Sequence, residues 1–390
     1  MKKILTTIAL FAIVGELSVL AAEGFSIKGF IPNVTDSVRI VIKNAENIDE
    51  TEILAKGMTA DGHFLLTGNV KYPVLSRISF SKHNRKSGRN MIVTEVEMML
   101  ENADYKVDAR VHADSLGKSY EPEKNFSIAG AAAQSEFDEY MDVVGDIRLR
   151  AKLAGYEHAS KYFESNDNPD TMAVYDALRD AADAELIAAK HKFIREHPSY
   201  HISSSLVFQE MRNLFMYTSP QLDEMFQTVK ICPDTARVNA LERRLHSASK
   251  YVLMQPYKDF SVNNVNGEEK RLSDFVIPGK YTFIDFWASW CGPCRSAIPH
   301  VAKLRDRYGD RMNVCSVSVD EEESAWRKAM EEENMAWTQL HLTPGQLKDA
   351  VQGYFITTIP RLILLDDSGR IVCSTNLPRI IDAYLEKNLK

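Results

Sequence analysis

Strand-like and helix-like runs alternate from about Leu253 to the C-terminus, and this pattern most restricts what the chain can fold into. The strand-like runs include YTFIDFWA, MNVCSVSVD, RLILLDDSG and RIVCSTN, and the helical runs include CRSAIPHVAKLRDRYG and RIIDAYLEKNL. Strands that alternate with helices form a sheet whose faces the helices cover. We therefore predict an α/β domain over residues 253–390, with a central mixed sheet flanked by helices.

Two cysteines stand at one strand-to-helix junction of this domain, in DFWASWCGPCRSAIP (residues 285–299). Cys291 falls at the start of the helix, where free backbone N–H groups and the positive end of the helix dipole stabilise a thiolate. Pro293 suits the first turn, which needs no N–H donor there, and Gly292 leaves room for a partner. Cys294 lies one turn further and faces Cys291, so the pair suits reversible disulfide formation through a mixed disulfide.

The cysteine pair has two other interpretations, an inert buried disulfide and a zinc site. The first is disfavoured because the strand-to-helix junction exposes the first sulfur. A tetrahedral zinc site needs two more ligands, yet the sequence has no second Cys-x-x-Cys, and His300 is a lone histidine. We expect neither a metal nor a cofactor.

Residues 23–130 alternate with period two, as in SVRIVIK and YKVDARV, which predicts a small antiparallel β-rich domain. Residues 131–252 change to helical periodicity, with a start signal at Pro169 and a stop at Pro198. The net charge of −7 lacks the basic footprint expected of a protein that binds nucleic acid.

The N-terminus, MKKILTTIALFAIVGELSVLAAEG, has the layout of a secretory signal, with two lysines, an apolar run and small residues at Ala21 and Ala22. We predict a signal peptide over residues 1–22, cleaved near Ala22, and no stable membrane insertion of the mature chain. The alternative is an uncleaved anchor, but Glu16 ends the apolar run well short of the ~20 residues that span a bilayer. Disulfides persist in the compartments that exported chains reach.

The segment around the cysteine pair resembles the active-site segment of thioredoxins. The matching positions are Asp285, Phe286, Trp287, Ala288, Trp290, Cys291, Gly292, Pro293, Cys294 and Pro299. A second element, TTIPRLILL, places Ile359-Pro360 at the family's cis-proline position. The extra length between Asp320 and Pro360, and the entry QPYKDFSVNNVNGEEKRLSDF, are similar to TlpA/ResA-type periplasmic thiol-disulfide oxidoreductases. The β-rich and helical regions resemble the N-terminal extension of some of these proteins.

This resemblance implies roles for the matched residues. Cys291 would be the attacking thiolate, Cys294 would resolve the mixed disulfide, and Asp285 would exchange a proton with Cys294. We expect burial to raise the pKa of Asp285 toward the working range; the alternative is a strand-end position that faces solvent. Two departures are Ala297, where relatives often carry an acid, and Ser316, where thioredoxins carry a lysine.

The resemblance also implies a substrate-binding surface around the pair. Trp290 would form part of its rim, beside Gly292 and Pro293; the alternative for this tryptophan is packing. Pro360, if cis, would hold the backbone of Ile359 for pairing with an extended substrate segment.

Three further cysteines are Cys232, Cys315 and Cys373. In the thioredoxin strand order, the strands of Cys315 and Cys373 are separated by two others, hence about 14 Å apart at ~4.8 Å per step. That distance exceeds the reach of a disulfide, so we predict buried free thiols. Cys232 has no predicted role.

The leading hypothesis is an exported, periplasmic thiol-disulfide oxidoreductase that reduces disulfides of envelope proteins. Its Gly-Pro dipeptide is that of thioredoxin, whose potential of about −270 mV contrasts with about −120 mV for the oxidant DsbA. The resemblance implies protein thiol or disulfide substrates and a membrane electron donor of the DsbD/CcdA kind.

Two alternatives belong to other classes. One is a binding or scaffold protein whose N-terminal region recognises an envelope partner, with redox activity secondary. The other is a peroxiredoxin-like peroxidase, whose Pro-x-x-x-Thr-x-x-Cys motif is absent before Cys291.

Overall fold

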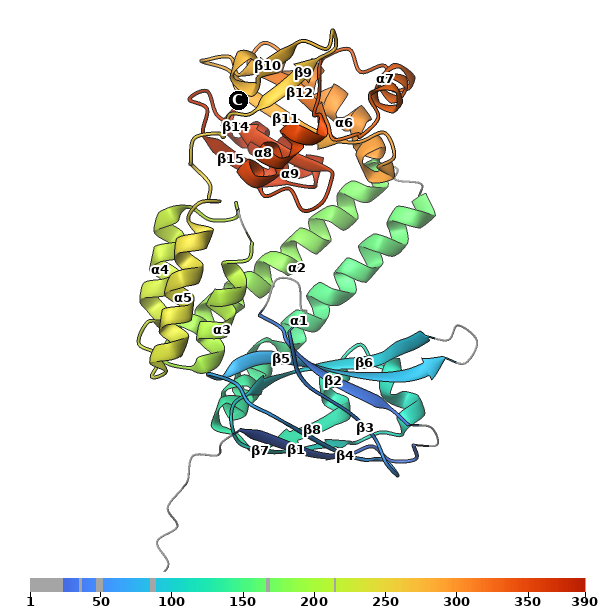
Figure 1. Cartoon of the computed structure of the whole chain (residues 1–390), viewed down its shortest axis with the longest axis vertical. Helices are drawn as coiled ribbons and strands as arrows, with labels where there is room; N and C mark the ends of the chain where they lie inside the picture. The colour runs from blue at the N-terminus through green and yellow to red at the C-terminus, as the bar shows by residue number, and fades with distance from the viewer. Residues whose placement is uncertain are drawn as a thin grey trace, which may run out of the picture. The chain divides into compact units, whose positions relative to one another are not determined.

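The computed structural model describes residues 24–34, 37–46, 52–84, 89–165, 169–213 and 215–389. The chain divides into two compact units, Met1–Arg179 and Asp180–Lys390 (Figure 1). The predicted signal peptide, residues 1–22, lies outside the described residues. Within them, no helix combines the length and the apolar character needed to cross a membrane.

The described part of the N-terminal unit contains two four-stranded sheets. Its strands are β1 (Phe25–Phe30), β2 (Arg39–Asn44), β3 (Ile53–Met58), β4 (His63–Gly68), β5 (Val74–Asn84), β6 (Arg89–Leu100), β7 (Asp104–Ala109) and β8 (Phe126–Ala129), with 3₁₀ turns η1 (Ala113–Lys118) and η2 (Pro122–Asn125). The sheet orders are β3-β2-β5-β6 and β4-β1-β7-β8. Alternate residues of both sheets, such as Ile27, Ile40, Phe80 and Val107, form one core.

The predicted antiparallel pairing holds for the first sheet and needs one correction in the second. There, β1 pairs with β7 in parallel. The other sheet lies between these strands in the sequence, and a connection of that length can return in the parallel direction. Period-two alternation shows which face of a strand is buried and leaves the direction of its neighbours open.

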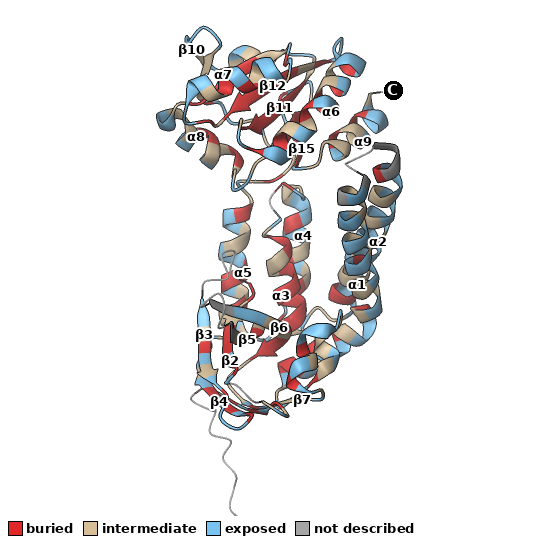
Figure 2. Ribbon diagram, turned by 90° about the vertical axis from the view of Figure 1, so that its right-hand side faces the viewer, coloured by how far each residue is buried: buried red, intermediate tan, exposed pale blue. Residues whose placement is uncertain are grey.

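Helices follow the β-rich region, as predicted. They are α1 (Ala132–Ser165), α2 (Pro169–Glu196), α3 (His201–Glu210), α4 (Ser219–Val229) and α5 (Thr235–Ala248). Helix α2 begins at the proline start signal and ends just before Pro198. Helix α1 is tied to β6, because Arg148 forms an ion pair with Glu97 at 2.8 Å. Most residues of α1 and α2 are exposed or half-buried (Figure 2).

The C-terminal unit holds a seven-stranded mixed sheet in the order β10-β9-β13-β12-β11-β14-β15. Its strands are β9 (Ser261–Asn264), β10 (Glu269–Arg271), β11 (Tyr281–Trp287), β12 (Met312–Ser318), β13 (Thr338–His341), β14 (Arg361–Leu365) and β15 (Ile371–Thr375), with 3₁₀ turn η3 (Leu272–Phe275). Its further helices are α6 (Gly292–Tyr308), α7 (Glu323–Glu332), α8 (Pro344–Tyr354) and α9 (Pro378–Asn388). Strand β11 pairs in parallel with β12 and antiparallel with β14, which confirms the predicted mixed sheet.

Alternation along β11 gives its two faces different partners. Phe283 packs with Val301 and Leu304 of α6 in one core cluster. Ile284 and Phe286 pack in a second cluster on the opposite face. Both faces of β11 are therefore covered, and the strand is buried along most of its length (Figure 2).

The loop between α3 and α4 contributes to this second cluster. Phe215 is 3% exposed and packs in the same core as Phe260 and Ile363. Its N–H donates to the carbonyl of Tyr251 at 2.8 Å, and the guanidinium of Arg361 lies 5.8 Å from its ring centroid. This loop and the sheet therefore share one hydrophobic core.

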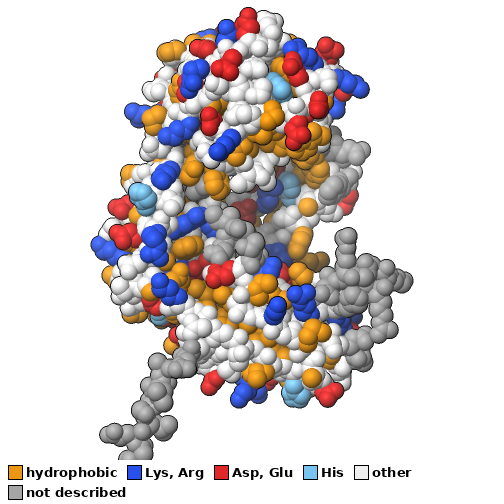
Figure 3. Space-filling model, viewed as in Figure 1, with side chains coloured by type: hydrophobic (Ala, Val, Ile, Leu, Met, Phe, Trp, Pro, Cys, Tyr) orange, Lys and Arg blue, Asp and Glu red, His pale blue; other side chains and the backbone are white. Residues whose placement is uncertain are grey.

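The visible surface of the C-terminal unit carries charges of both signs. Acidic and basic side chains are interspersed on the face shown in Figure 3, with apolar side chains between them. A surface of mixed sign does not steer a partner of one charge, as a single-sign surface does.

Candidate active site

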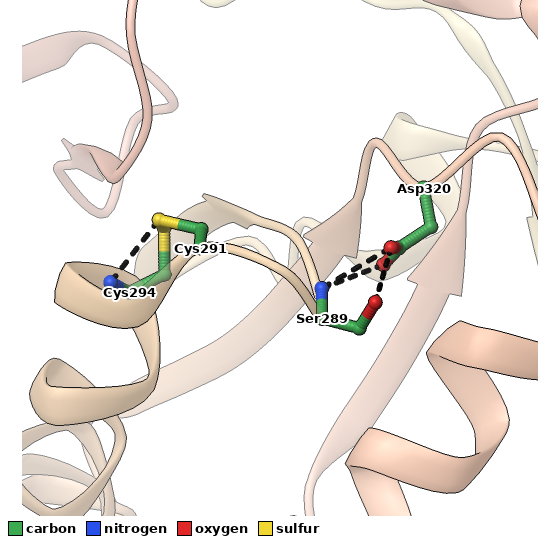
Figure 4. Close-up of a disulfide and its surroundings, with 4 residues drawn as sticks. All are labelled: Ser289, Cys291, Cys294 and Asp320. Carbon is green, nitrogen blue, oxygen red and sulfur yellow. Dashed lines mark hydrogen bonds between the residues drawn. A yellow bond between two sulfur atoms is a disulfide. The ribbon is translucent and has the colours of Figure 1, made fainter.

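The cysteine pair lies at the N-terminus of α6. Cys291 immediately precedes the helix, and Pro293 occupies its first turn. A disulfide joins Cys291 to Cys294, with 5.2 Å between their Cα atoms (Figure 4). The backbone N–H of Cys294 donates to the sulfur of Cys291 at 3.2 Å. In the reduced protein, this N–H and the helix dipole favour a thiolate at Cys291.

The pair packs in an apolar cluster, and exposed residues stand next to it in the sequence. Cys291 and Cys294 are 5% and 1% exposed and pack with the buried indoles of Trp287 and Trp326. Trp290 is 71% exposed, so the alternative that it packs in the interior is wrong. Gly292 and Pro293 are also exposed. These three residues form the exposed surface next to the pair, whereas Cys291 itself, which the sequence predicted to be exposed, is buried.

The second predicted element lies against the same cluster. The Ile359-Pro360 peptide bond is cis. Pro360 is buried, while Ile359 is half-buried and packs against the cluster that contains Cys291 and Cys294. The structure thus brings this dipeptide to the cysteines, and its part in substrate binding stays a prediction.

Asp285 is buried, at 3% exposure, so the alternative of a solvent-facing position is wrong. Its place between Phe283 and Trp287 in the strand alternation puts it on the face of β11 that α6 covers. Burial raises the pKa of Asp285 to about 7, and a hydrogen bond from the Ser316 hydroxyl at 3.2 Å acts in the opposite direction. A carboxyl group with this pKa can both take and return a proton near neutral pH.

A second acidic residue supports the loop that carries the cysteines. Asp320 is 2% exposed, and its carboxylate accepts from the Ser289 N–H at 2.9 Å and from the Ser289 hydroxyl at 2.6 Å (Figure 4). The Ser318 hydroxyl donates to the same carboxylate at 2.7 Å. Sequence reasoning missed this contact. Its signal was available, because Ser289 and Asp320 follow two parallel strands, whose carboxyl ends meet at one edge of a sheet.

The residue after the pair is held by the inserted helix α7. Arg295 donates to Glu333 at 2.6 Å and to Glu332 at 3.0 Å. These two carboxylates balance the positive charge next to Cys294. Ala297, which stands where relatives often carry an acidic residue, lies in α6 one turn into the helix.

The three remaining cysteines are buried free thiols, which confirms the prediction for Cys315 and Cys373. Strands β11 and β14 separate their strands, as the thioredoxin order implied. Burial raises the pKa of Cys315 to about 12 and that of Cys373 to about 11. Such thiols are protonated at neutral pH and are poor nucleophiles.

Residues that could hold a metal do not gather in the part of the chain that the structure describes. No group of three or more His, Cys, Asp or Glu side chains is placed there to bind an ion. His300 lies on α6, and burial lowers its pKa.

Comparison with known proteins agrees with this geometry. Residues 253–374 match the AhpC/TSA family. The chain is 31% identical over 120 residues to the thioredoxin-like protein YneN of Bacillus subtilis (strain 168), a match that covers 30% of this chain and 67% of YneN. The chain belongs to the thioredoxin-like thiol-disulfide oxidoreductases.

Other similar proteins are thiol-disulfide oxidoreductases by name. Thiol-disulfide oxidoreductase ResA of Bacillus thuringiensis subsp. konkukian (strain 97-27) is 24% identical over 115 residues, covering 29% of this chain and 64% of ResA. The chain thus spans about two thirds of the length of these curated relatives. A thiol:disulfide interchange protein from Bacteroides sp. is 30% identical, covering 35% of this chain and 89% of that one, with a TM-score of 0.33.

Proposed function

We propose that this oxidoreductase reduces disulfides of exported envelope proteins through Cys291 and Cys294. The observation that carries the proposal is the position of Cys291 before α6, where the Cys294 N–H donates to its sulfur. That position lowers the cost of a thiolate and leaves it beside an exposed surface. The thioredoxin dipeptide between the cysteines supports the reducing direction.

The reaction balances as two thiol-disulfide exchanges. The Cys291 thiolate attacks one sulfur of a substrate disulfide, a mixed disulfide forms, and the other substrate sulfur leaves as a thiolate. Cys294 then gives its proton to the Asp285 carboxylate and attacks the Cys291 sulfur. The second substrate sulfur leaves, the substrate has gained two electrons, and the protein holds the Cys291–Cys294 disulfide.

The substrate-binding surface that we propose consists of Trp290, Gly292, Pro293, Ile359 and Pro360. Trp290 offers a largely exposed ring beside the cysteines. Ile359 lies two residues before the start of β14, where an extended segment could pair with its backbone.

We further propose the compartment and the division of labour along the chain. Residues 1–22 direct export to the periplasm and are removed. Residues 23–130 and 131–252 form the β-rich and helical extension, and residues 253–390 carry the redox chemistry. In an oxidising compartment a reductant must be recharged, so the proposal includes a membrane electron donor of the DsbD/CcdA kind.

Trapping tests the attacking residue and names the substrates. We expect Cys294→Ser to accumulate mixed disulfides on Cys291, because the resolving thiol is gone. The captured partners are identified by mass spectrometry of the non-reduced envelope fraction. Cys291→Ser is the matched control and should trap no partner through Cys294. If the Cys294→Ser variant yields no adduct on Cys291, the assignment of the attacking thiol is wrong.

A redox titration of the full chain tests the direction. We expect a midpoint closer to the thioredoxin value of about −270 mV than to the DsbA value of about −120 mV. A midpoint more oxidising than about −180 mV, the value of protein disulfide isomerase, would contradict the reductase function.

A further inference from the structure

The buried Asp285 has a neutral partner where thioredoxins carry a lysine. Ser316 lies opposite Asp285 in the register of β11 and β12, and its hydroxyl donates to Oδ2 of Asp285 at 3.2 Å. Ser316 is fully buried. A hydroxyl has one proton to donate and two acceptor lone pairs, so Ser316 can donate to the carboxylate while its oxygen accepts from another donor.

Trp337 is that other donor. Its indole N–H donates to the Ser316 oxygen at 2.9 Å. An indole can only donate, so the Ser316 oxygen must accept here and its own proton remains available for Asp285. The guanidinium of Arg305 lies 5.3 Å from the Trp337 ring centroid and holds the ring from the α6 side.

The result is a directed chain of hydrogen bonds from Trp337 through Ser316 to Asp285. The Ser316 bond occupies Oδ2 of Asp285 whether the carboxyl group is charged or neutral, because a protonated carboxyl keeps an acceptor oxygen. The other oxygen, Oδ1, is then the one that takes and returns a proton. Trp337 also packs against the cluster that contains Cys291 and Cys294, so this series of hydrogen bonds lies beside the redox pair.

We propose that Ser316 and Trp337 are positioning residues that hold Oδ2 of Asp285 and leave Oδ1 to exchange the proton of Cys294. This inference rests on the proposed function, in which Asp285 serves the resolving step. Trp337 immediately precedes β13, in the stretch that is longer than in a minimal thioredoxin. The inserted segment would thus supply, through a neutral hydroxyl, the control of Asp285 that a lysine supplies elsewhere.

No charged group among the described residues is a cause of the pKa shift of Asp285. The causes of the raised pKa of Asp285 are its burial and, in the opposite direction, Ser316. Arg305 faces the Trp337 ring from α6. The neighbouring residue on β14, Leu362, is apolar.

Stopped-flow oxidation of the reduced full chain by 5,5′-dithiobis(2-nitrobenzoate) separates the two steps. Attack by Cys291 releases one thionitrobenzoate, and attack by Cys294 on the mixed disulfide releases the second. We expect Ser316→Ala to slow the second release about fivefold at pH 7 and to move its pH midpoint upward, because a rise of about one unit from a pKa of about 7 lowers the ionised fraction of Asp285 from about one half to about one tenth. The first release should stay unchanged.

Three variants complete the design. Trp337→Phe should slow the second release less than Ser316→Ala, because the hydroxyl remains but its direction is free. Ser316→Thr retains the hydroxyl and should restore the wild-type profile. Ser374→Ala is the matched control, a buried serine on β15 of the same sheet, and should leave both phases unchanged.

The outcomes test the positioning role and the proposed function separately. An unchanged second phase in Ser316→Ala overturns the positioning role, as does an equal slowing of both phases, which would indicate general loosening. If Ser316→Ala does not fold, an unchanged second phase in Trp337→Phe has the same consequence. If the wild type shows no first release from Cys291, the proposed function itself fails.

Discussion

At the scale of the residue, Asp285 makes stability depend on pH. Its pKa is about 7 in the folded protein because burial disfavours the charge, against about 3.9 in an unfolded chain. The folded state therefore binds the proton more tightly. The contribution of the protonated Asp285 to the free energy of unfolding is fully present below about pH 4 and is lost as pH rises to about 7.

Asp285→Asn removes this titration while keeping the shape of the side chain. We expect the difference in unfolding free energy between the variant and wild type to grow by about 3 kcal/mol, in favour of the variant, as pH rises from 5 to 8. This follows from 1.36 kcal/mol per pKa unit. Urea unfolding of the oxidised proteins at several pH values measures the difference. The other titrating groups cancel in this comparison, so a difference that does not vary with pH would show that Asp285 has an ordinary pKa.

The sequence revealed some residues of the site and concealed others for a physical reason. Cys291, Cys294 and Asp285 stand in one short segment whose strand-to-helix junction can be recognised locally. Ser316 could be placed near Asp285 only through the resemblance to thioredoxins, and Trp337, which reaches Ser316 from just before β13, was missed. Which residues face each other across a parallel pair depends on register, and no local pattern states the register of β11 against β12.

At the scale of the element, the loop between β11 and α6 depends on one carboxylate. We expect Asp320→Ala to lower the unfolding free energy by about 2–4 kcal/mol, because losing a hydrogen bond to a charged group and leaving a buried donor unpaired each cost about 1–3 kcal/mol. The first thionitrobenzoate release should also slow, since Ser289 no longer anchors the residues before Cys291. Urea unfolding and the stopped-flow assay measure the two effects.

Ser289→Ala is the matched control for this loop. It removes the hydroxyl but keeps the backbone N–H that Asp320 also binds at 2.9 Å. Its effects should be smaller than those of Asp320→Ala in both assays. Equal effects of the two variants would show that the hydroxyl alone carries the anchor.

Element types were predictable because they depend on local periodicity. Strand and helix alternation after Leu253 is regular enough to give the mixed sheet, and proline signals placed the ends of α2. The parallel pair β1–β7 was not predictable, because the direction of a neighbour depends on how a long connection returns. The anchor between Ser289 and Asp320 joins the ends of two parallel strands, so it could have been predicted from the strand order that the resemblance implied.

At the scale of the whole molecule, the sequence suggested that the helical segment ends where the α/β domain begins. The structure instead places Phe215, from the loop before α4, in the core of the sheet with Phe260 and Ile363. The composition change near Leu253 could not show this, because a single apolar residue in a loop carries no periodic signal. A chain that starts at residue 253 would lack part of its own core.

Phe215→Ala tests whether the redox domain depends on this loop. We expect a loss of about 3–5 kcal/mol, the usual cost of truncating a buried phenylalanine. Cys315 lies in the same cluster and is fully buried, so its alkylation under native conditions, followed by mass spectrometry, should become faster. Met216→Ala is the neighbouring control; Met216 is 56% exposed, and its truncation should change stability by less than about 0.5 kcal/mol. If Cys315 is alkylated at the wild-type rate in Phe215→Ala, the sheet is stable without the loop, and residues 253–390 form an independent domain.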